Sequence, residues 1–168
     1  MSTQQMYIIA TIVENKPGVL CEVANMFRRR SFNIDSISVG PVETTDLARM
    51  TITVLGDDAT IEQIVKQLHK IIAVIKVSIL DPKNSVTREL ALVKVHTTDT
   101  KARSDMIQYI NIFRGHIIDV SQETIIAEIT GDPEKIDAFI DLSRPFGVKE
   151  IARTGITALT RGRRAISE

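Results

Sequence analysis

The sequence has 168 residues, of which 43% are hydrophobic and 25% are charged, a composition typical of folded domains rather than disordered chains. Lys plus Arg number 21 and Asp plus Glu also number 21, so no net charge attracts nucleic acid, an anionic membrane or an acidic substrate. A single cysteine excludes an internal disulfide framework, and no apolar run approaches the ~20 residues of a spanning helix. We therefore expect a cytoplasmic protein that binds neither nucleic acid nor membranes.

The first half of the chain predicts a strand, a helix, two strands, a helix and a strand. Tyr7 to Val13 is a β-branched apolar run of strand length, and the apolar residues that follow recur at helical spacing until Arg28 to Arg30. Gly56-Asp57-Asp58 opens the second helix, with Thr60 and Gln63 as its capping box. The remaining strands are expected at 34–39, 49–54 and 74–80.

The second half repeats this order of elements. Asp132-Pro133-Glu134 is a strong helix start, because Asp is a good N-cap and Pro fits the first helical position. The expected elements are strand 89–96, helix 101–113, strands 116–120 and 124–129, a helix from 133, and strand 148–156. The fold class is therefore α+β, with two tandem ferredoxin-like βαββαβ modules. We expect domains at 1–81 and 82–168, the second ending in a short basic tail.

Such a module has exposed surfaces that need a partner. A four-stranded sheet with both helices on one side leaves its other face and its edge strands uncovered, and a module of this size is close to the lower limit for independent stability. Edge-to-edge pairing of two copies would give one eight-stranded sheet. We therefore expect a homodimer.

Catalytic and metal-binding motifs are absent from the chain. It contains no GxGxxG, GxxxxGK[ST], HExxH or GxSxG motif and no EF-hand loop. The isolated polar candidates are interpreted as surface, cap or tail residues: His69, His96, His116, Asp57-Asp58, Arg28–Arg30 and Arg161–Arg164. Cys21 is interpreted as a small buried packing residue. The sequence thus predicts no catalytic residue, no metal site and no cofactor.

The turn between the first strand and the first helix is the informative segment. Pro17 fixes φ near the first helical position, and Gly18 lets a ligand approach where a Cβ would block it. The peptide nitrogens of Gly18, Val19 and Leu20 should lack intrahelical partners at the positive end of the helix. A carboxylate bound there would gain about 0.3–2 kcal/mol from the helix dipole, and an amino acid supplies one.

Side chains near this turn suit the rest of an amino acid. Asn15 and Asn33 could contact its carboxylate and ammonium groups, and the apolar neighbours could contact an aliphatic side chain. The residues that we expect to bind an effector are Asn15, Pro17, Gly18, Val19, Leu20, Asn33 and Ile34. On spacing alone, a tight turn without a ligand is an equally good interpretation, because these residue types are common in turns.

Several motifs resolve this ambiguity by resemblance. The run ENKPGVL after an apolar strand, followed by a helix and by Phe32-Asn33-Ile34-Asp35-Ser36, resembles the ACT domain, a family of small amino-acid-binding regulatory modules. Five further segments are similar to the small regulatory subunits of acetolactate synthase, also called acetohydroxyacid synthase: 49–52, 66–70, 88–95, 112–120 and 152–162. The resemblance covers nearly the whole chain in order.

The resemblance implies a non-catalytic partner of a thiamine-diphosphate-dependent enzyme of valine and isoleucine biosynthesis. Such a subunit activates the catalytic (large) subunit and confers allosteric feedback inhibition, usually by valine. The effector would contact Asn15, Gly18 and the amides around Val19 and Leu20, with Asn33 and Ile34 contributed by the facing protomer. Thiamine diphosphate, Mg²⁺ and FAD would belong to the catalytic subunit, and none is expected in this chain.

Two residues depart from the family pattern. Ser31 stands where a glycine usually follows the helix, which makes a left-handed helix exit uncertain. Cys21 replaces a small residue and could narrow the effector pocket. Two other functions stay open: a freestanding amino-acid-binding ACT sensor that acts on transcription or another enzyme, and a small enzyme, which no acid, base or nucleophile arrangement supports.

Overall fold

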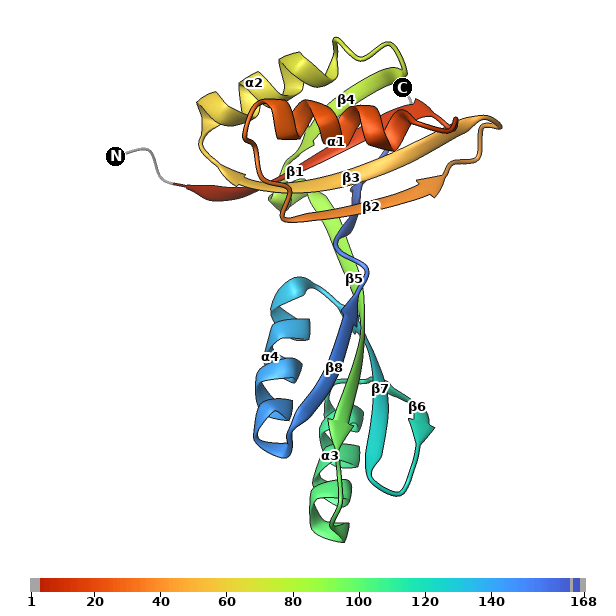
Figure 1. Ribbon diagram of the computed structural model, residues 1–168, viewed down its shortest axis with the longest axis vertical. Coiled ribbons are helices and arrows are strands. Elements are labelled where there is room, and N and C mark those ends of the chain that lie inside the picture. Colours follow the sequence, from red (N-terminus) through yellow and green to blue (C-terminus); the bar gives the residue numbers. More distant parts are fainter. Residues whose placement is uncertain (1–3, 164, 167–168) are drawn as a thin grey trace. The chain divides into compact units, whose positions relative to one another are not determined.

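The chain folds into two structural units, and each unit contains one antiparallel sheet (Figure 1). The computed structural model describes residues 4–163 and 165–166. Unit 1 comprises Met1–Val86 together with Ile156–Glu168, and unit 2 comprises Thr87–Gly155. Arg164, part of the expected basic tail, lies outside the described residues.

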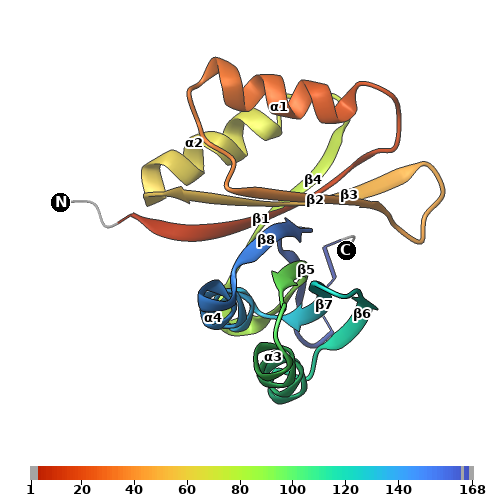
Figure 2. The same cartoon turned by 60° about the horizontal axis from the view of Figure 1, so that its bottom comes forward.

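Unit 1 has the expected βαββαβ order. Its elements are β1 (Gln5–Glu14), α1 (Val19–Arg29), β2 (Ser36–Pro41), β3 (Leu47–Gly56), α2 (Asp58–Leu68) and β4 (Val74–Leu80). The strands run antiparallel in the order β2-β3-β1-β4, so β2 and β4 are the edges of the described sheet. Figures 1 and 2 show α1 and α2 side by side on one face of this sheet.

Residue spacing explains how the two helices pack. Val19, Val23 and Phe27 recur every four residues, and all three are buried in the core of unit 1.

The predicted capping box of α2 is wrong, because the side chain of Asp57 accepts a hydrogen bond from the Thr60 nitrogen at 2.9 Å. Asp57 therefore caps α2, and the helix begins at Asp58.

A short C-terminal segment covers the other face of the first sheet. After Gly155 the chain forms β9 (Thr157–Thr160), and Ile156, Ala158 and Ile166 pack with Ile8, Ala10, Ile12 and Leu80 in a second apolar cluster. Ser38 Oγ donates to the Ile156 carbonyl at 3.0 Å, and Arg49 Nη2 donates to the Ala158 carbonyl at 2.7 Å. The face that the sequence left open is thus partly closed by the chain itself.

Unit 2 repeats the first fold (Figure 2). Its elements are β5 (Ser85–His96), α3 (Thr100–Ile112), β6 (His116–Val120), β7 (Thr124–Gly131), α4 (Pro133–Ser143) and β8 (Val148–Arg153). Short 3₁₀ helices occupy Pro82–Asn84, before β5, and Arg144–Phe146, after α4. The strand order is β6-β7-β5-β8. The tandem ferredoxin-like architecture predicted from the sequence is confirmed.

One buried carboxylate in unit 2 is fully paired. The side chain of Glu89 is 4% exposed and receives two hydrogen bonds from Arg153, at 2.6 and 2.7 Å. Arg153 Nη1 also contacts Asp137 of α4 at 2.7 Å. The hydrogen bond to Glu89, supported by Asp137, raises the pKa of the Arg153 guanidinium.

The structural units differ from the expected domains 1–81 and 82–168. Unit 1 extends to Val86 and regains the chain at Ile156, so unit 2 is inserted between these points. The strand expected at 148–156 ends earlier, at Arg153, and the chain turns at Gly155 with φ 78° before β9 begins at Thr157. Within the described part of the expected tail, Ile166 is 8% exposed and packs on the first sheet. Within the described residues, no helix is long and apolar enough to cross a membrane.

Candidate functional site in the turn before the first helix

The turn between β1 and α1 has an unusual helix start. Gly18 is the N-cap residue, with φ 94° and ψ −21°, and no side chain caps the helix. This left-handed conformation is costly for residues with a Cβ, by about 1–2 kcal/mol, and explains why glycine occupies the position. A Cβ added at Gly18 would meet no atom within 4 Å, so the space next to its backbone is open.

Peptide nitrogens in this turn are available to a ligand. Val19 N donates weakly to the Lys16 carbonyl at 3.4 Å, which differs from the expectation that it is unbonded. The nitrogens of Gly18, Leu20 and Cys21 have no acceptor in the part of the chain that the structure describes. These N–H groups lie at the positive end of α1 and therefore form a site suited to an anion such as a carboxylate.

Of the side chains around the turn, Asn15 and Leu20 are exposed to solvent and Val19 is buried. Asn15 is exposed, and its backbone is held by a 2.7 Å hydrogen bond from its nitrogen to the Asp46 carbonyl. Leu20 is 48% exposed and is the apolar side chain next to the open amides, whereas Val19 is buried in the core of unit 1. An aliphatic ligand could therefore contact Leu20 directly.

Asn33 and Ile34 lie far from this turn within one chain. They precede β2, whose first residue Ser36 pairs with Thr53 and, through it, is level with Ile8 of β1. The turn follows Glu14, so about six strand residues, or ~20 Å, separate the two groups. Asn33 is exposed, and Ile34 packs partly against the core. One protomer alone does not bring the predicted residues together.

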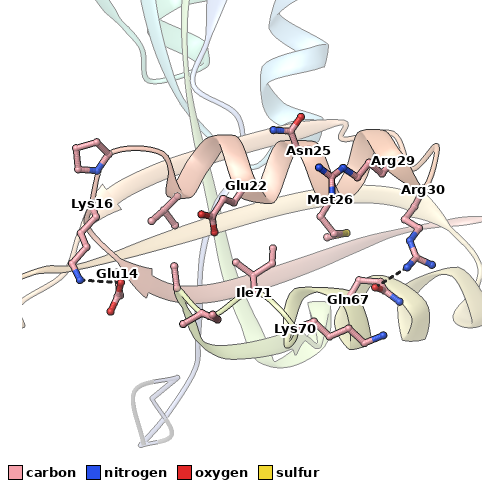
Figure 3. A pocket seen from close by; sticks show the side chains of 14 residues that line it. Glu14, Lys16, Glu22, Asn25, Met26, Arg29, Arg30, Gln67, Lys70 and Ile71 are labelled. Atoms are coloured by element: carbon pink, nitrogen blue, oxygen red, sulfur yellow. Dashed lines mark hydrogen bonds and ion pairs between the residues drawn. The ribbon is translucent and has the colours of Figure 1, made fainter.

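A cavity of 630 Å³ lies beside the turn, between α1 and the connection from α2 to β4 (Figure 3). Pro17 and Val19 line it, but Gly18 and Leu20 do not. Figure 3 shows Lys16 and Glu14 at one end and Arg30 and Gln67 at the other; these pairs are joined at 3.1 and 3.0 Å. The open amides and this cavity are therefore separate features of the same helix.

The structure shows the conformation of Ser31 and the exposure of Cys21, the two residues that depart from the family pattern. Ser31 adopts φ 56°, so the left-handed helix exit forms with serine in place of glycine. Ser31 N bonds to the Arg28 carbonyl at 3.2 Å and Phe32 N to the Phe27 carbonyl at 3.1 Å, the pattern of a Schellman motif. The expected burial of Cys21 is wrong: its side chain is exposed, and Asn25 Nδ2 lies 3.3 Å from its sulfur.

Metal-ligating clusters are absent from the part of the chain described: no group of three or more His, Cys, Asp or Glu residues there could hold a metal ion.

One charged residue that the sequence did not single out is Arg49 of β3, which lines a second cavity on the face of the sheet opposite α1 and α2. Its only sequence signal is a cation within an otherwise buried, alternating strand.

Two family models match the chain and together cover most of it. Residues 9–76 match the model described as an AHAS small subunit-like ACT domain. Residues 88–162 match the model described as the small subunit of acetolactate synthase.

Individual relatives agree with these matches. A probable acetolactate synthase small subunit of Methanothermobacter thermautotrophicus is 57% identical over 160 residues, covering 95% of each chain. The acetolactate synthase small subunit of Mycolicibacterium smegmatis is 46% identical over 160 residues, covering 95% of this chain and 94% of the relative. A crystal structure of the small subunit from Thermotoga maritima superimposes with a TM-score of 0.88 at 49% identity, covering 95% of this chain and 99% of that one.

Proposed function

Because the chain belongs to the family of acetolactate synthase small subunits, we propose that it activates a separate catalytic subunit and makes it sensitive to a branched-chain amino acid. Valine is the expected effector. In this proposal thiamine diphosphate, Mg²⁺ and FAD would belong to the catalytic subunit, none would bind this chain, and both subunits would be cytoplasmic. The chain itself carries out no reaction in this proposal.

The observation that carries the proposal is the uncapped start of α1. Open amides, a left-handed glycine with free space beside it, and the exposed Leu20 together suit a carboxylate with an aliphatic side chain. Each of the other three described α-helices begins with an aspartate whose side chain caps the first turn. The start of α1 thus leaves room for a ligand that supplies the missing acceptor.

A homodimer would complete the site. Strand β2 is an edge strand, and Val39 on it is 47% exposed. Pairing β2 with the same strand of a second copy about a twofold axis runs the two strands antiparallel. Ser36 of the partner subunit then lies beside Pro41, which is level with Val13 and so with the end of β1.

This arrangement brings the two halves of the predicted site to one end of the joined sheet. Asn33 and Ile34 of the partner subunit would approach the turn at Asn15–Gly18 from about three strand spacings, or ~14 Å. A ligand between them would contact both protomers, so it would bind the dimer rather than the isolated chain.

Reconstitution with the catalytic subunit tests this function. We expect the wild-type chain to raise synthase activity and valine to lower it again. Gly18→Asp places a negative charge where the carboxylate would bind, so inhibition should be lost while activation is kept. Gly18→Ala is the matched control, since it carries the same backbone strain without the charge. Inhibition by valine that persists in Gly18→Asp would contradict the site.

Two further measurements separate the alternatives. A freestanding sensor would leave synthase activity unchanged on mixing, and a small enzyme would turn over substrate alone. Val39→Lys should convert the dimer to monomers in sedimentation experiments, whereas Ile79→Lys on the opposite edge strand should not. Calorimetry with valine, leucine and isoleucine identifies the effector. Equal behaviour of the two lysine variants would contradict pairing through β2.

A further inference from the structure

The second cavity of unit 1 lies on the sheet face opposite α1 and α2. It has a volume of 360 Å³ and is enclosed by the β2–β3 connection and by the C-terminal segment. Four of its lining residues, Ile12, Val42, Leu47 and Ile166, belong to the second apolar cluster or pack against it. Leu159 and Ala165 complete the aliphatic wall. This volume lies within the range of small-molecule binding pockets, so the cavity can admit a small amino acid.

Arg49 brings a positive charge to this cavity. Its Nη2 donates to the Ala158 carbonyl at 2.7 Å, and its Nε is buried with no acceptor among the described residues. Among residues 4–163 and 165–166, no carboxylate lies within ion-pair distance of its guanidinium. A partly buried guanidinium ordinarily pairs with a carboxylate or phosphate, because burial without a counter-ion is costly.

Glu43 lines the same cavity and adds the opposite charge. It is exposed, lies on the β2–β3 connection, and forms no ion pair in the described structure. One cavity therefore offers a cation, an anion and an aliphatic wall. A molecule that matches all three features is a zwitterion with a short apolar side chain.

We propose that this cavity is a second binding site, distinct from the turn before α1, for a small aliphatic α-amino acid. The ligand carboxylate binds Arg49, and the ammonium group faces Glu43. The side chain packs against the aliphatic wall. The β2–β3 connection also carries Asp46, whose carbonyl accepts the Asn15 nitrogen, so a ligand here contacts the loop that holds the first site.

The test counts sites by calorimetry of the full-length chain with L-valine and L-leucine. Wild type should bind two molecules per chain. Gly18→Asp should lose one site and Arg49→Met the other, the latter by a weakening of at least about tenfold. Loss of all binding in Gly18→Asp, with Arg49→Met unchanged, would overturn this inference while the proposed function stands. Loss in Arg49→Met alone would support the cavity and contradict the site at the turn.

Two controls separate ligand contacts from loosening of β9. Ser38→Ala removes another hydrogen bond to the same segment without touching the cavity, and it should bind like wild type. Glu43→Gln lies on an exposed connection, so the fold should be kept. It should weaken L-valine about tenfold but leave 3-methylbutanoate unchanged, because that probe lacks the ammonium group. Unchanged valine binding in both Arg49→Met and Glu43→Gln, or stronger binding of 3-methylbutanoate than of valine, would overturn the proposal.

Discussion

The two units treat the same strand–helix turn differently. In unit 2 the N-cap residue of α3 is Asp99, whose carboxylate accepts the Ala102 nitrogen at 2.7 Å. Arg103 of its first turn donates to the Ser121 carbonyl at 2.8 Å, which holds a neighbouring loop. In unit 1 the N-cap residue of α1 is Gly18, which supplies no side-chain cap, and peptide nitrogens of the first turn have no acceptor among the described residues. The first turn of the helix is capped by the chain itself in unit 2, whereas in unit 1 it keeps peptide nitrogens that have no acceptor among the described residues.

Charged groups follow the same division. Glu89 in unit 2 is buried and doubly bonded to Arg153, whereas Arg49 in unit 1 is partly buried and has no carboxylate partner in the described chain. Burial lowers the pKa of Arg49, but the hydrogen bond from Arg153 to Glu89 raises the pKa of Arg153. The two arginines therefore differ in charge pairing. Buried side-chain atoms without a partner among the described residues occur in both units, at Thr11, Arg49 and Ser85 of unit 1 and at His96 and Thr97 of unit 2.

Breaking the paired charge of unit 2 should give the largest effect. Arg153→Met leaves Glu89 buried without its partner, which should lower the free energy of unfolding of unit 2 by about 3 kcal/mol. Urea denaturation followed by amide hydrogen exchange in β5 measures the loss. Arg88→Met is the control, because Arg88 is exposed and, among the described residues, its side chain bonds to the adjacent Thr87 carbonyl alone. Equal stability of the two variants would contradict a structural role for the pair.

A second comparison concerns two glycines in turns. A Cβ at Gly115 would come within 2.8 Å of the Glu128 carbonyl oxygen, whereas Gly18 has free space. Gly115→Ala should therefore destabilise unit 2 by about 1–3 kcal/mol through overpacking. Thermal unfolding checks this, with Gly40→Ala as control, since nothing lies within 4 Å of a Cβ there. A Gly115→Ala protein as stable as wild type would show that the neighbours yield easily.

Removing the aspartate cap of α3 should make its first turn resemble the uncapped first turn of α1. Asp99→Ala frees the Ala102 nitrogen and should lower the free energy of unfolding by about 1 kcal/mol. Asp99→Asn keeps an acceptor at the same position and should retain most of the stability. Denaturant titration of the three proteins decides the matter, and a loss as large in Asp99→Asn as in Asp99→Ala would assign the effect to charge instead of capping.

The smallest effect is expected at the helix exits, where the units agree. Ser31 after α1 and Arg114 after α3 adopt φ values of 56° and 52°. Replacement by glycine relieves strain but adds freedom to the unfolded chain, so Ser31→Gly and Arg114→Gly should each raise stability by about 0.5–1 kcal/mol. Differential scanning calorimetry of both variants measures the gain. Destabilisation in either one would mean that its side chain makes a compensating contact.

Local patterns predicted most of the fold. Asp132 caps α4 with Pro133 at its first position, as the sequence indicated, because cap chemistry involves neighbouring residues only. The cap of α2 was misplaced by three residues, since Asp57 and Thr60 are both good caps and the choice depends on packing. The return of β9 to the first sheet was not predicted, because a four-residue strand carries little periodicity and because Ser38 and Arg49, which bond to the backbone of this segment, lie more than 100 residues away.

The candidate site was predicted in part. The turn at Pro17-Gly18 was identified because its residue types have strong backbone preferences, and the structure has the left-handed glycine there. The seven-residue set stays a prediction, since two of its members lie at the other end of the sheet and need a second chain. Arg49 escaped notice because an unpaired charge is recognised by what surrounds it in space, and sequence spacing does not report that.

The C-terminal segment, through Ile156, Ala158 and Ile166, determines which fragments of the protein keep the first sheet covered. A fragment that stops before unit 2 would expose Ile8, Ala10 and Ile12 to water, so it would not be a faithful miniature of the amino-terminal module. Permuting the gene so that residues 156–166 precede β1 would keep that covering with its sheet. Such a rearranged chain would allow unit 1 to be studied without the inserted unit 2.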